Sequence, residues 1–407
     1  DALGGAIAGG EYNIAIGNYT LDALTSGDEN IAIGYSAGTA LTTGGSNVFI
    51  GNNAAGTGVV TGANNIGIGA NSCENMTSGN TNVGIGARTL HATTTGVKNT
   101  CVGMEAGEDM VSAQNSTLMG YRTGYVNTAH ELTAFGSESA LANTSGAGIT
   151  AIGREAYKTG DTESHNMAIG LQTMDTGVNG GEYNVAVGNF ALKRITSADS
   201  CTAVGYQAGN DKTSGNHGTF IGYNAGLNCT TGTDVTFVGS EAGDGHDTES
   251  YNTGVGSGAL GGPIAGGEYN VAVGAYTLDA LTTGDNNVAI GYNAGTALTT
   301  AASTVIIGSQ AGEALTEGSS CVLVGKQAGN AVTTGTNNIF MGVHAGHDIT
   351  TGGSNIAIGA ESYDGCDAED HNLAIGRHAL GGAVAGGEYN VAIGNYTLDA
   401  VTTADYN

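Results

Sequence analysis

The sequence reads Thr-Thr-Gly-Asp-Asn-Asn-Val-Ala-Ile-Gly-Tyr-Asn-Ala-Gly at residues 282–295. Its Asn-Val-Ala-Ile-Gly pentad places two β-branched residues around a small one, which is typical of a short β-strand. Close copies of this pentad lie at residues 13–17, 30–34 and 390–394. Positions in the repeat are numbered so that the glycine ending the pentad, Gly291 here, is position 5.

The repeat fills the chain at a nearly constant period. There are 23 glycines at position 5, and they are 17 residues apart except for four spacings of 18 and one of 16. A short fixed period indicates a solenoid whose coils stack on one another. The sequence therefore predicts an all-β parallel β-solenoid of about 23 coils of 17 residues, as one continuous domain over residues 1–407. Because the pattern is already under way at both ends, we expect the chain to be a piece of a longer fibre.

The composition disfavours several classes of protein. The 407 residues include 73 Gly, and 37 Asp plus Glu against 10 Lys plus Arg give a net charge of −27. So many glycines disfavour the helices of a typical enzyme, and phosphate contacts to nucleic acid need Lys and Arg. No apolar stretch approaches the roughly 20 residues of a membrane helix. We expect an extracellular, non-enzymatic structural protein with no membrane segment and no cofactor, apart from weakly bound Ca²⁺ at acidic turns.

Position 3, at the centre of the pentad, is usually Ala or Gly but is large and apolar in seven coils. The seven residues are Phe49, Leu118, Phe220, Phe237, Ile306, Leu323 and Phe340. Position 3 points to the opposite face of the strand from positions 2 and 4, which we expect to be buried within the chain. Strands that are apolar on both faces are normally covered on both. The pattern thus predicts that the position-3 face packs against other subunits, most simply in a homotrimer.

Position 1 is asparagine in 15 of the 23 coils. The longest consecutive run is Asn13, Asn30, Asn47, Asn65, Asn82 and Asn99. Stacked amide side chains hydrogen-bond from rung to rung in cross-β structures, so the run predicts a structural ladder. The alternative is an exposed row of amides that binds glycans.

Position 7 forms a second informative column. In consecutive coils it reads Arg88, Glu105, Arg122, Glu138 and Glu155, and the alternating signs favour ion pairs between neighbouring coils. Further along, the same column includes His344, Glu361 and His378. These are residue types that bind transition metals, so they are the candidate metal ligands, with solvated surface charge as the alternative.

Tyrosines recur at position 6, directly after the glycine. They are Tyr35, Tyr121, Tyr206, Tyr223 and Tyr292. Aromatic rings in a row can contact sugars or anchor a partner. They can equally be packing residues at the corner of each coil.

The stretch at residues 287–295, with the turn at 282–286 before it, resembles the head repeats of YadA-type trimeric autotransporter adhesins. Cys-Thr-Ala-Val-Gly-Tyr-Gln-Ala at residues 201–208 resembles the repeat arrays of bacteriophage tail fibres. The resemblance covers the whole chain. It implies a left-handed parallel β-roll, three chains around one axis, and attachment to a glycan or protein receptor on a host cell. Adhesin head coils are typically shorter than these, so the phage arrays are the closer match.

Three functions remain open from the sequence. The first, which we expect, is the shaft of a bacteriophage or virus tail fibre on the virion. The second is a bacterial cell-surface trimeric adhesin or an extracellular filament. The third is an ice- or glycan-binding solenoid that uses its Thr-Thr turns as a flat array, although the turns vary, as at residues 25–26 and 197–198.

Overall fold

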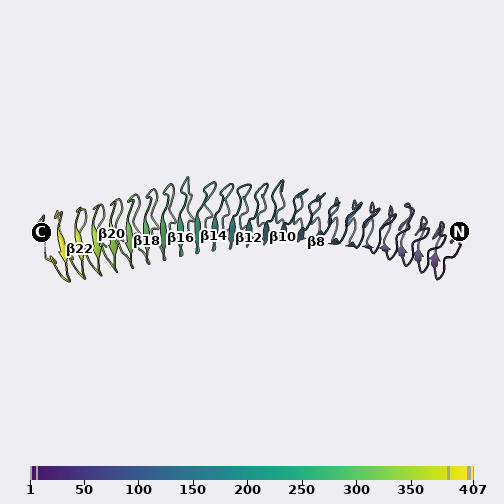
Figure 1. The fold of residues 1–407 in the computed structure, drawn as a ribbon, viewed down its shortest axis with the longest axis horizontal. Helices are drawn as coiled ribbons and strands as arrows, with labels where there is room; N and C mark the ends of the chain where they lie inside the picture. The colour runs from purple at the N-terminus through teal and green to yellow at the C-terminus, as the bar shows by residue number, and fades with distance from the viewer. Residues whose placement is uncertain (1, 6–7, 383–385, 401–404, 407) are drawn as a thin grey trace. The chain divides into compact units, whose positions relative to one another are not determined.

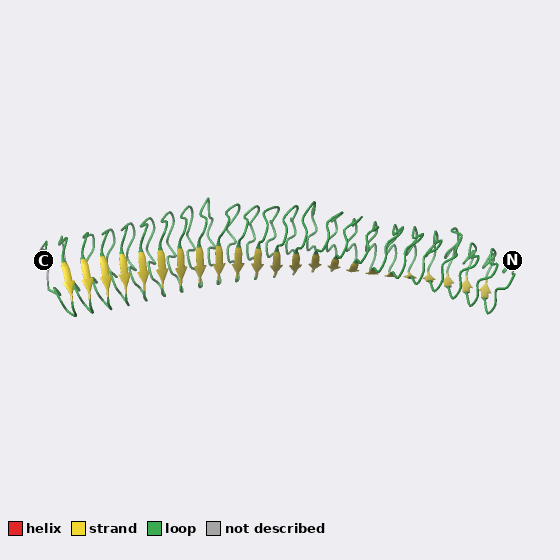
Figure 2. Ribbon diagram, viewed as in Figure 1, coloured by secondary structure: helices red, strands yellow, loops and turns green. Residues whose placement is uncertain are grey.

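The computed structural model describes residues 2–5, 8–382, 386–400 and 405–406. It comprises two compact units, residues 1–200 and residues 201–407. Figure 1 shows that, within each unit, the coils follow one another in chain order. Each coil has one short strand, and the rest of the coil is turns and loops (Figure 2). The described residues contain no helix, and so none that could cross a membrane.

The first unit has eleven of these strands, each of three residues. They are β1 (Ile14–Ile16), β2 (Ile31–Ile33), β3 (Val48–Ile50), β4 (Ile66–Ile68), β5 (Val83–Ile85), β6 (Thr100–Val102), β7 (Thr117–Met119), β8 (Thr133–Phe135), β9 (Thr150–Ile152), β10 (Met167–Ile169) and β11 (Val185–Val187).

The second unit continues the same pattern. Its strands are β12 (Thr202–Val204), β13 (Thr219–Ile221), β14 (Thr236–Val238), β15 (Thr253–Val255), β16 (Val271–Val273), β17 (Val288–Ile290), β18 (Val305–Ile307), β19 (Val322–Val324), β20 (Ile339–Met341), β21 (Ile356–Ile358), β22 (Leu373–Ile375) and β23 (Val391–Ile393).

Within each unit, every strand pairs in parallel and in register with the strand of the next coil. Ile14 lies opposite Ile31, and Ile31 lies opposite Val48. The second unit does the same, with Val288 opposite Val305. Each residue therefore stacks on the same position of the next coil, at the strand spacing of about 4.8 Å. The prediction of an all-β parallel β-solenoid with about 23 coils of 17 residues is confirmed.

The strands turn position 3 toward the inside of the coil, which corrects the prediction of a subunit interface. Positions 2 and 4 point outward instead, as Val305 and Ile307 do in β18. The seven large residues at position 3 are fully buried within their own chain. These residues are Phe49, Leu118, Phe220, Phe237, Ile306, Leu323 and Phe340. They are core residues, and the interface assigned to them is wrong.

The narrow interior of the coil explains this orientation. Position 3 faces position 9, and the interior between them has room for only one large side chain. Phe340 at position 3 faces Gly346, where a Cβ atom would lie only 2.6 Å from the Phe340 ring. Where position 3 is Ala374, position 9 is Leu380, and both residues are fully buried. In several coils a small residue at position 3 is thus matched by a large one at position 9. Where both are small, as at Ala289 and Gly295, side chains of the neighbouring coils such as Leu278 and Ile306 fill the space.

Glycine recurs at position 5 because the next coil lies too close for a side chain. Gly291 has a φ of 138°, which few other residues adopt. A Cβ atom on Gly291 would also lie 2.5 Å from the carbonyl oxygen of Gly308, the position-5 glycine of the next coil. Conformation and contact together require glycine here, which explains the regular period of the sequence.

The asparagines at position 1 form a buried ladder. The backbone N–H and Nδ2 of Asn30 both donate to Asn13 Oδ1, at 2.9 and 3.1 Å. Asn30 Nδ2 also donates to the carbonyl of Gly44 across the same coil. The ladder of paired bonds continues through Asn47, Asn65, Asn82 and Asn99. Because these amides are buried from Asn30 onward, they hold coils together and are not presented to a glycan.

We expect Asn47→Ala to lower the free energy of unfolding by about 2 kcal/mol or more. The substitution removes a donor to Asn30 Oδ1 and an acceptor for Asn65, and each buried polar group left without a bond costs about 1–3 kcal/mol. Asn47→Thr is the matched control, since Thr304 occupies position 1 and donates to the asparagine below it. We expect Asn47→Thr to be more stable than Asn47→Ala, and denaturant titration measures the difference. Equal losses for the two variants would contradict a hydrogen-bonded ladder.

A buried glutamate from the preceding coil supports three of the 18-residue coils. Glu163 Oε2 accepts the backbone N–H groups of Asp161 and Thr162, while its Oε1 accepts that of Gly180 in the longer coil. A carboxylate bound by several N–H donors is strongly held. The glutamate thus binds the backbone of the longer coil next to it, at Gly180. The same contacts recur at Glu249 with Gly266 and at Glu369 with Gly386.

Candidate functional site

The outward side chains at positions 2 and 4 form a surface in each unit that we call the strand face. Position 4 is Ile, Val, Met or Phe in every coil, and neither position carries an ionisable residue. Its exposed members at position 4 include Ile16, Ile85, Met119, Ile221, Ile290, Ile307, Met341 and Ile358. Soluble monomers rarely expose a long continuous apolar surface. The strand face is therefore the first candidate for contact with a partner.

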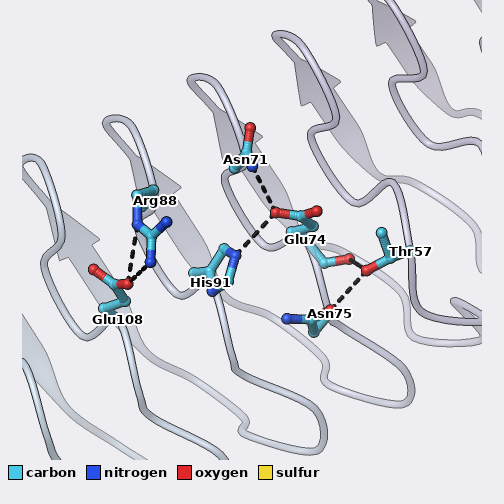
Figure 3. Close-up of polar contacts among 7 residues, drawn as sticks. All are labelled: Thr57, Asn71, Glu74, Asn75, Arg88, His91 and Glu108. Carbon is cyan, nitrogen blue, oxygen red and sulfur yellow. Dashed lines mark hydrogen bonds and ion pairs between the residues drawn. The ribbon is translucent and has the colours of Figure 1, made fainter.

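Positions 7 and 10 of successive coils form a second surface, which we call the polar ridge (Figure 3). Arg88 at position 7 forms an ion pair with Glu108 at position 10 of the next coil. Glu74 accepts a hydrogen bond from Asn71 at 2.7 Å and lies 2.9 Å from Nε2 of His91, which occupies position 10 of the next coil. These contacts join neighbouring coils at the corner that follows each strand.

The alternating charges of position 7 pair only partly as the sequence predicts. Arg122 Nε lies 3.3 Å from Glu105 Oε2, a pair within position 7. Glu138 and Glu155 instead both pair with Lys158 at position 10, at 2.8 and 3.5 Å. The sequence could not show this, because the corner of the coil brings positions 7 and 10 together. Ion pairs that stay partly exposed contribute about 0–1 kcal/mol each, so the pairs of Arg122 and Lys158 add little to the stability.

The predicted metal ligands do not converge on one point in the described part of the chain. Glu361 Oε2 lies 2.5 Å from His378 Nε2 and 3.6 Å from Arg377 Nη2, so it is engaged in ion pairs. The ring of His344 lies 5.2 Å from that of His347 instead. Glu361 and His378 thus meet as the column predicts, but the three predicted ligands do not form one cluster.

A different set of donor atoms does come together at this corner. The ligand atoms of His347, Asp348 and Asp364 all lie within 4.8 Å of one another. Among the described residues this is the one group of three or more His, Cys, Asp or Glu side chains with such geometry. His347 and Asp364 both occupy position 10, in successive coils, so the in-register stacking brings them together.

No protein-family model matches this chain, and no curated protein matches it. The likeness to adhesin heads and phage fibre arrays therefore rests on the repeat alone. Function has to be inferred from the fold and from the surfaces that it presents.

The acidic turns hold their carboxylates in separate hydrogen bonds. Asp367 accepts from the Thr350 hydroxyl, and Asp370 Oδ1 accepts the backbone N–H of Gly353 at 2.6 Å. Glu369 points inward, as described above. Ca²⁺ needs several oxygens directed at one point, and these carboxylates are directed at different donors.

The position-6 tyrosines are exposed, as the sequence suggests. Tyr206 and Tyr223, in consecutive coils, stack with their ring centres 5.6 Å apart and their planes 10° from parallel. Tyr35 meets Tyr19 edge-on at 5.6 Å. In the stacked pair, Tyr206 and Tyr223 each cover a ring face on which a sugar would stack, so this pair is better suited to packing. Tyr121 and Tyr292 are exposed too, in coils whose neighbours have no tyrosine at position 6.

A second aromatic column, at position 17, is an addition to the predicted features. Tyr251 and Tyr269 stack with ring centres 4.7 Å apart and planes 4° from parallel. His165 stacks on Tyr183, and His371 on Tyr389, in the same way. The sequence contained a signal for this column: one coil before the tyrosine of each of these three Gly-Gly-Glu-Tyr-Asn segments lies a His-Asn or Tyr-Asn pair.

The threonines of the Thr-Thr turns bond along the stack. The hydroxyl of Thr282 donates to the carbonyl of Thr299 at 3.0 Å, and that of Thr299 donates to the carbonyl of Thr316 at 3.1 Å. The chain of bonds continues through Thr333 to Thr350. The first threonine of each turn thus serves coil stacking.

Position 12 carries an unexpected run of buried ionisable residues in the second unit. Eleven of the 23 coils have Leu, Val, Ile or Met there, but three consecutive coils have Lys212, Cys229 and His246, all buried. Lys212 donates to the carbonyl of Gly232, and its Nζ lies 3.9 Å from Cys229 Sγ. Burial lowers the pKa of His246 from the usual 6.5 to about 3.

We expect His246→Leu to make the chain less sensitive to acid. Because the folded state disfavours protonated His246, the unfolded chain binds more protons between pH 6.5 and pH 3, and stability falls as the pH falls through this range. The slope from one such group is at most about 1.4 kcal/mol per pH unit. Denaturant midpoints at pH 7 and pH 4.5 measure the difference. His217→Leu, which removes an exposed histidine, is the control, and equal slopes in both variants would contradict this account.

Proposed function

We propose that this chain forms the structural shaft of a bacteriophage or virus tail fibre and acts by assembly and geometry rather than by catalysis. The strand face, an uncharged surface with a large apolar residue at position 4 of every coil, is the observation that carries the proposal. Enzymes gather a few reactive groups in one pocket, whereas this chain repeats one coil and one outward face. The role places the protein outside cells, on the virion.

The strand face supports self-assembly into a homotrimer. Covering its side chains gains about 25 cal/mol per Å² of apolar surface. Each chain carries a net charge of −27, but positions 2 and 4 have no charged residues. Two strand faces can therefore meet without bringing like charges of these positions together. Three copies around an axis cover three strand faces at once, which is the arrangement that the resemblance to trimeric fibres implies. The buried position-3 residues have no part in this interface.

The stacked coils support a mechanical role. Stability in a solenoid is approximately a sum over coils and the contacts between them, so length can be extended without a larger core. The acidic surface opposes lateral clumping of assembled fibres. In this role the shaft holds a receptor-binding tip away from the virion, and repeated weak contacts along it to a glycan or protein receptor on the host cell add to attachment.

An adhesin or extracellular filament on a bacterial surface is the alternative that uses the same strand face. Ice or glycan binding has less support, because the turn threonines bond along the stack and the rings of Tyr206 and Tyr223 cover each other.

Immunogold electron microscopy of the native source, with an antibody raised against this chain, separates the two leading functions. We expect label on the fibres of virus particles. Label on cell envelopes or free filaments would replace the tail-fibre proposal with the adhesin or filament.

A further inference from the structure

The corner at His347 is built from residues of two neighbouring coils of the second unit. His347 Nδ1 lies 2.7 Å from Asp348 Oδ1 and 4.0 Å from Asp364 Oδ1. The side chains of His347 and Asp364 are about one-third exposed, at 31% and 28%, whereas Asp348 is 61% exposed. An ion at this corner would therefore have protein ligands on one side and water on the other.

The donor distances suit a small divalent ion. Zinc binds nitrogen and oxygen ligands at about 2.0–2.2 Å, which places pairs of ligands about 3–3.6 Å apart. The two distances from His347 Nδ1 bracket this range, and all three ligand atoms lie within 4.8 Å of one another, so modest side-chain movements would bring them into place. One imidazole with two carboxylates favours a first-row transition ion over Ca²⁺ or Mg²⁺, which prefer all-oxygen sites.

The electrostatics of the corner also favour a cation. The carboxylates of Asp348 and Asp364 lie close together, since the three ligand atoms are all within 4.8 Å of one another. Two carboxylates this close repel each other, and a divalent ion between them would relieve that repulsion. The ring of His344, 5.2 Å from that of His347, offers a further nitrogen at the edge of the site.

Within the described residues, no other histidine has this combination of ligands. His91 also occupies position 10 and pairs with a carboxylate of the adjacent coil, Glu74, but the residue after it is Ala92 (Figure 3). His378 pairs with Glu361, which Arg377 also approaches. The His347 corner differs because Asp348 adds a second carboxylate.

We infer that His347, Asp348 and Asp364 form a binding site for a divalent transition-metal ion such as Zn²⁺, which joins two successive coils. This inference does not depend on the proposed function. The ion replaces the proton on His347 Nδ1 and takes water in its open positions. Because ligands come from both coils, binding stabilises the folded chain by the amount that the free-ion concentration and the dissociation constant set.

Titration calorimetry with Zn²⁺ alone, at pH 7.5, tests the inference on the full chain. We expect His347→Ala and Asp364→Asn each to weaken Zn²⁺ binding at least tenfold. His91→Ala, at the same coil position but beside one carboxylate, is the matched control and should bind as the unsubstituted chain does. Asp364→Asn preserves the shape of the side chain, and circular dichroism verifies that each variant is folded.

A second readout links the ion to the contact between coils. Saturating Zn²⁺ should raise the unfolding temperature of the unsubstituted chain and of His91→Ala, but not that of Asp364→Asn. The inference is overturned if the unsubstituted chain does not bind Zn²⁺ in the millimolar range or below. It is equally overturned if His347→Ala and Asp364→Asn bind as tightly as His91→Ala, or if Ca²⁺ binds as tightly as Zn²⁺.

Discussion

Gly346→Leu is expected to destabilise the second unit strongly, because position 9 faces a phenylalanine in this coil. A Cβ atom on Gly346 would lie 2.6 Å from two carbons of the Phe340 ring, so the larger side chain has no room. Overpacking of a core typically costs about 1–3 kcal/mol or more. The φ of 59° at this position is not the obstacle, since Leu380 has a φ of 49° at the same position of its coil.

Phe340→Ala is expected to cost about 3–5 kcal/mol on its own, because it leaves a cavity in the coil. The double variant, with alanine at 340 and leucine at 346, recreates the Ala374 and Leu380 pair of the coil two repeats later. It should therefore be more stable than either single variant. Denaturant midpoints for the four proteins measure the coupling. Losses that simply add would contradict the pairing of positions 3 and 9 across the interior.

Charges placed on the strand face are expected to abolish self-association. The double variant Ile290→Glu and Ile307→Glu puts two carboxylates at position 4 of neighbouring coils, where both side chains are exposed in the single chain. An unpaired carboxylate in an apolar interface is strongly unfavourable. The variant should remain folded, because position 4 is outside the core, and should sediment as a single chain.

Thr283→Glu with Thr300→Glu is the matched control for these charges. It adds the same charge to the turns of the same two coils, at exposed residues away from the strand face. We expect it to associate like the unsubstituted chain. If both double variants dissociate, net charge rather than the strand face governs association; if neither does, the strand face is not the interface.

The sequence predicted the coil but assigned its inside and outside the wrong way round. Positions 2 and 4 are the more apolar, and the usual rule that the more apolar face is buried led to the error. The better signal was the pairing of sizes within one coil: Phe237 with Gly243, Phe340 with Gly346 and Ala374 with Leu380. Such reciprocal sizes indicate two residues that share one small space.

The surface could be predicted less well, because it depends on how the corner folds. Position 1 directly precedes the strand, so the asparagine ladder followed directly from in-register stacking. Positions 7 and 10 come together only through the turn between them, where residues such as Asn293 at position 7 adopt positive φ values. The sequence therefore could not show that Lys158 pairs with Glu138, or that His347 meets Asp364.

The mass of the folded chain in solution tests the proposed assembly most directly. Light scattering coupled to size-exclusion chromatography, at micromolar concentration and physiological salt, should give three times the 40.1 kDa of one chain. A mass of one chain across the accessible concentration range would contradict the account, because the strand face would then be stable in water without a second copy to cover it.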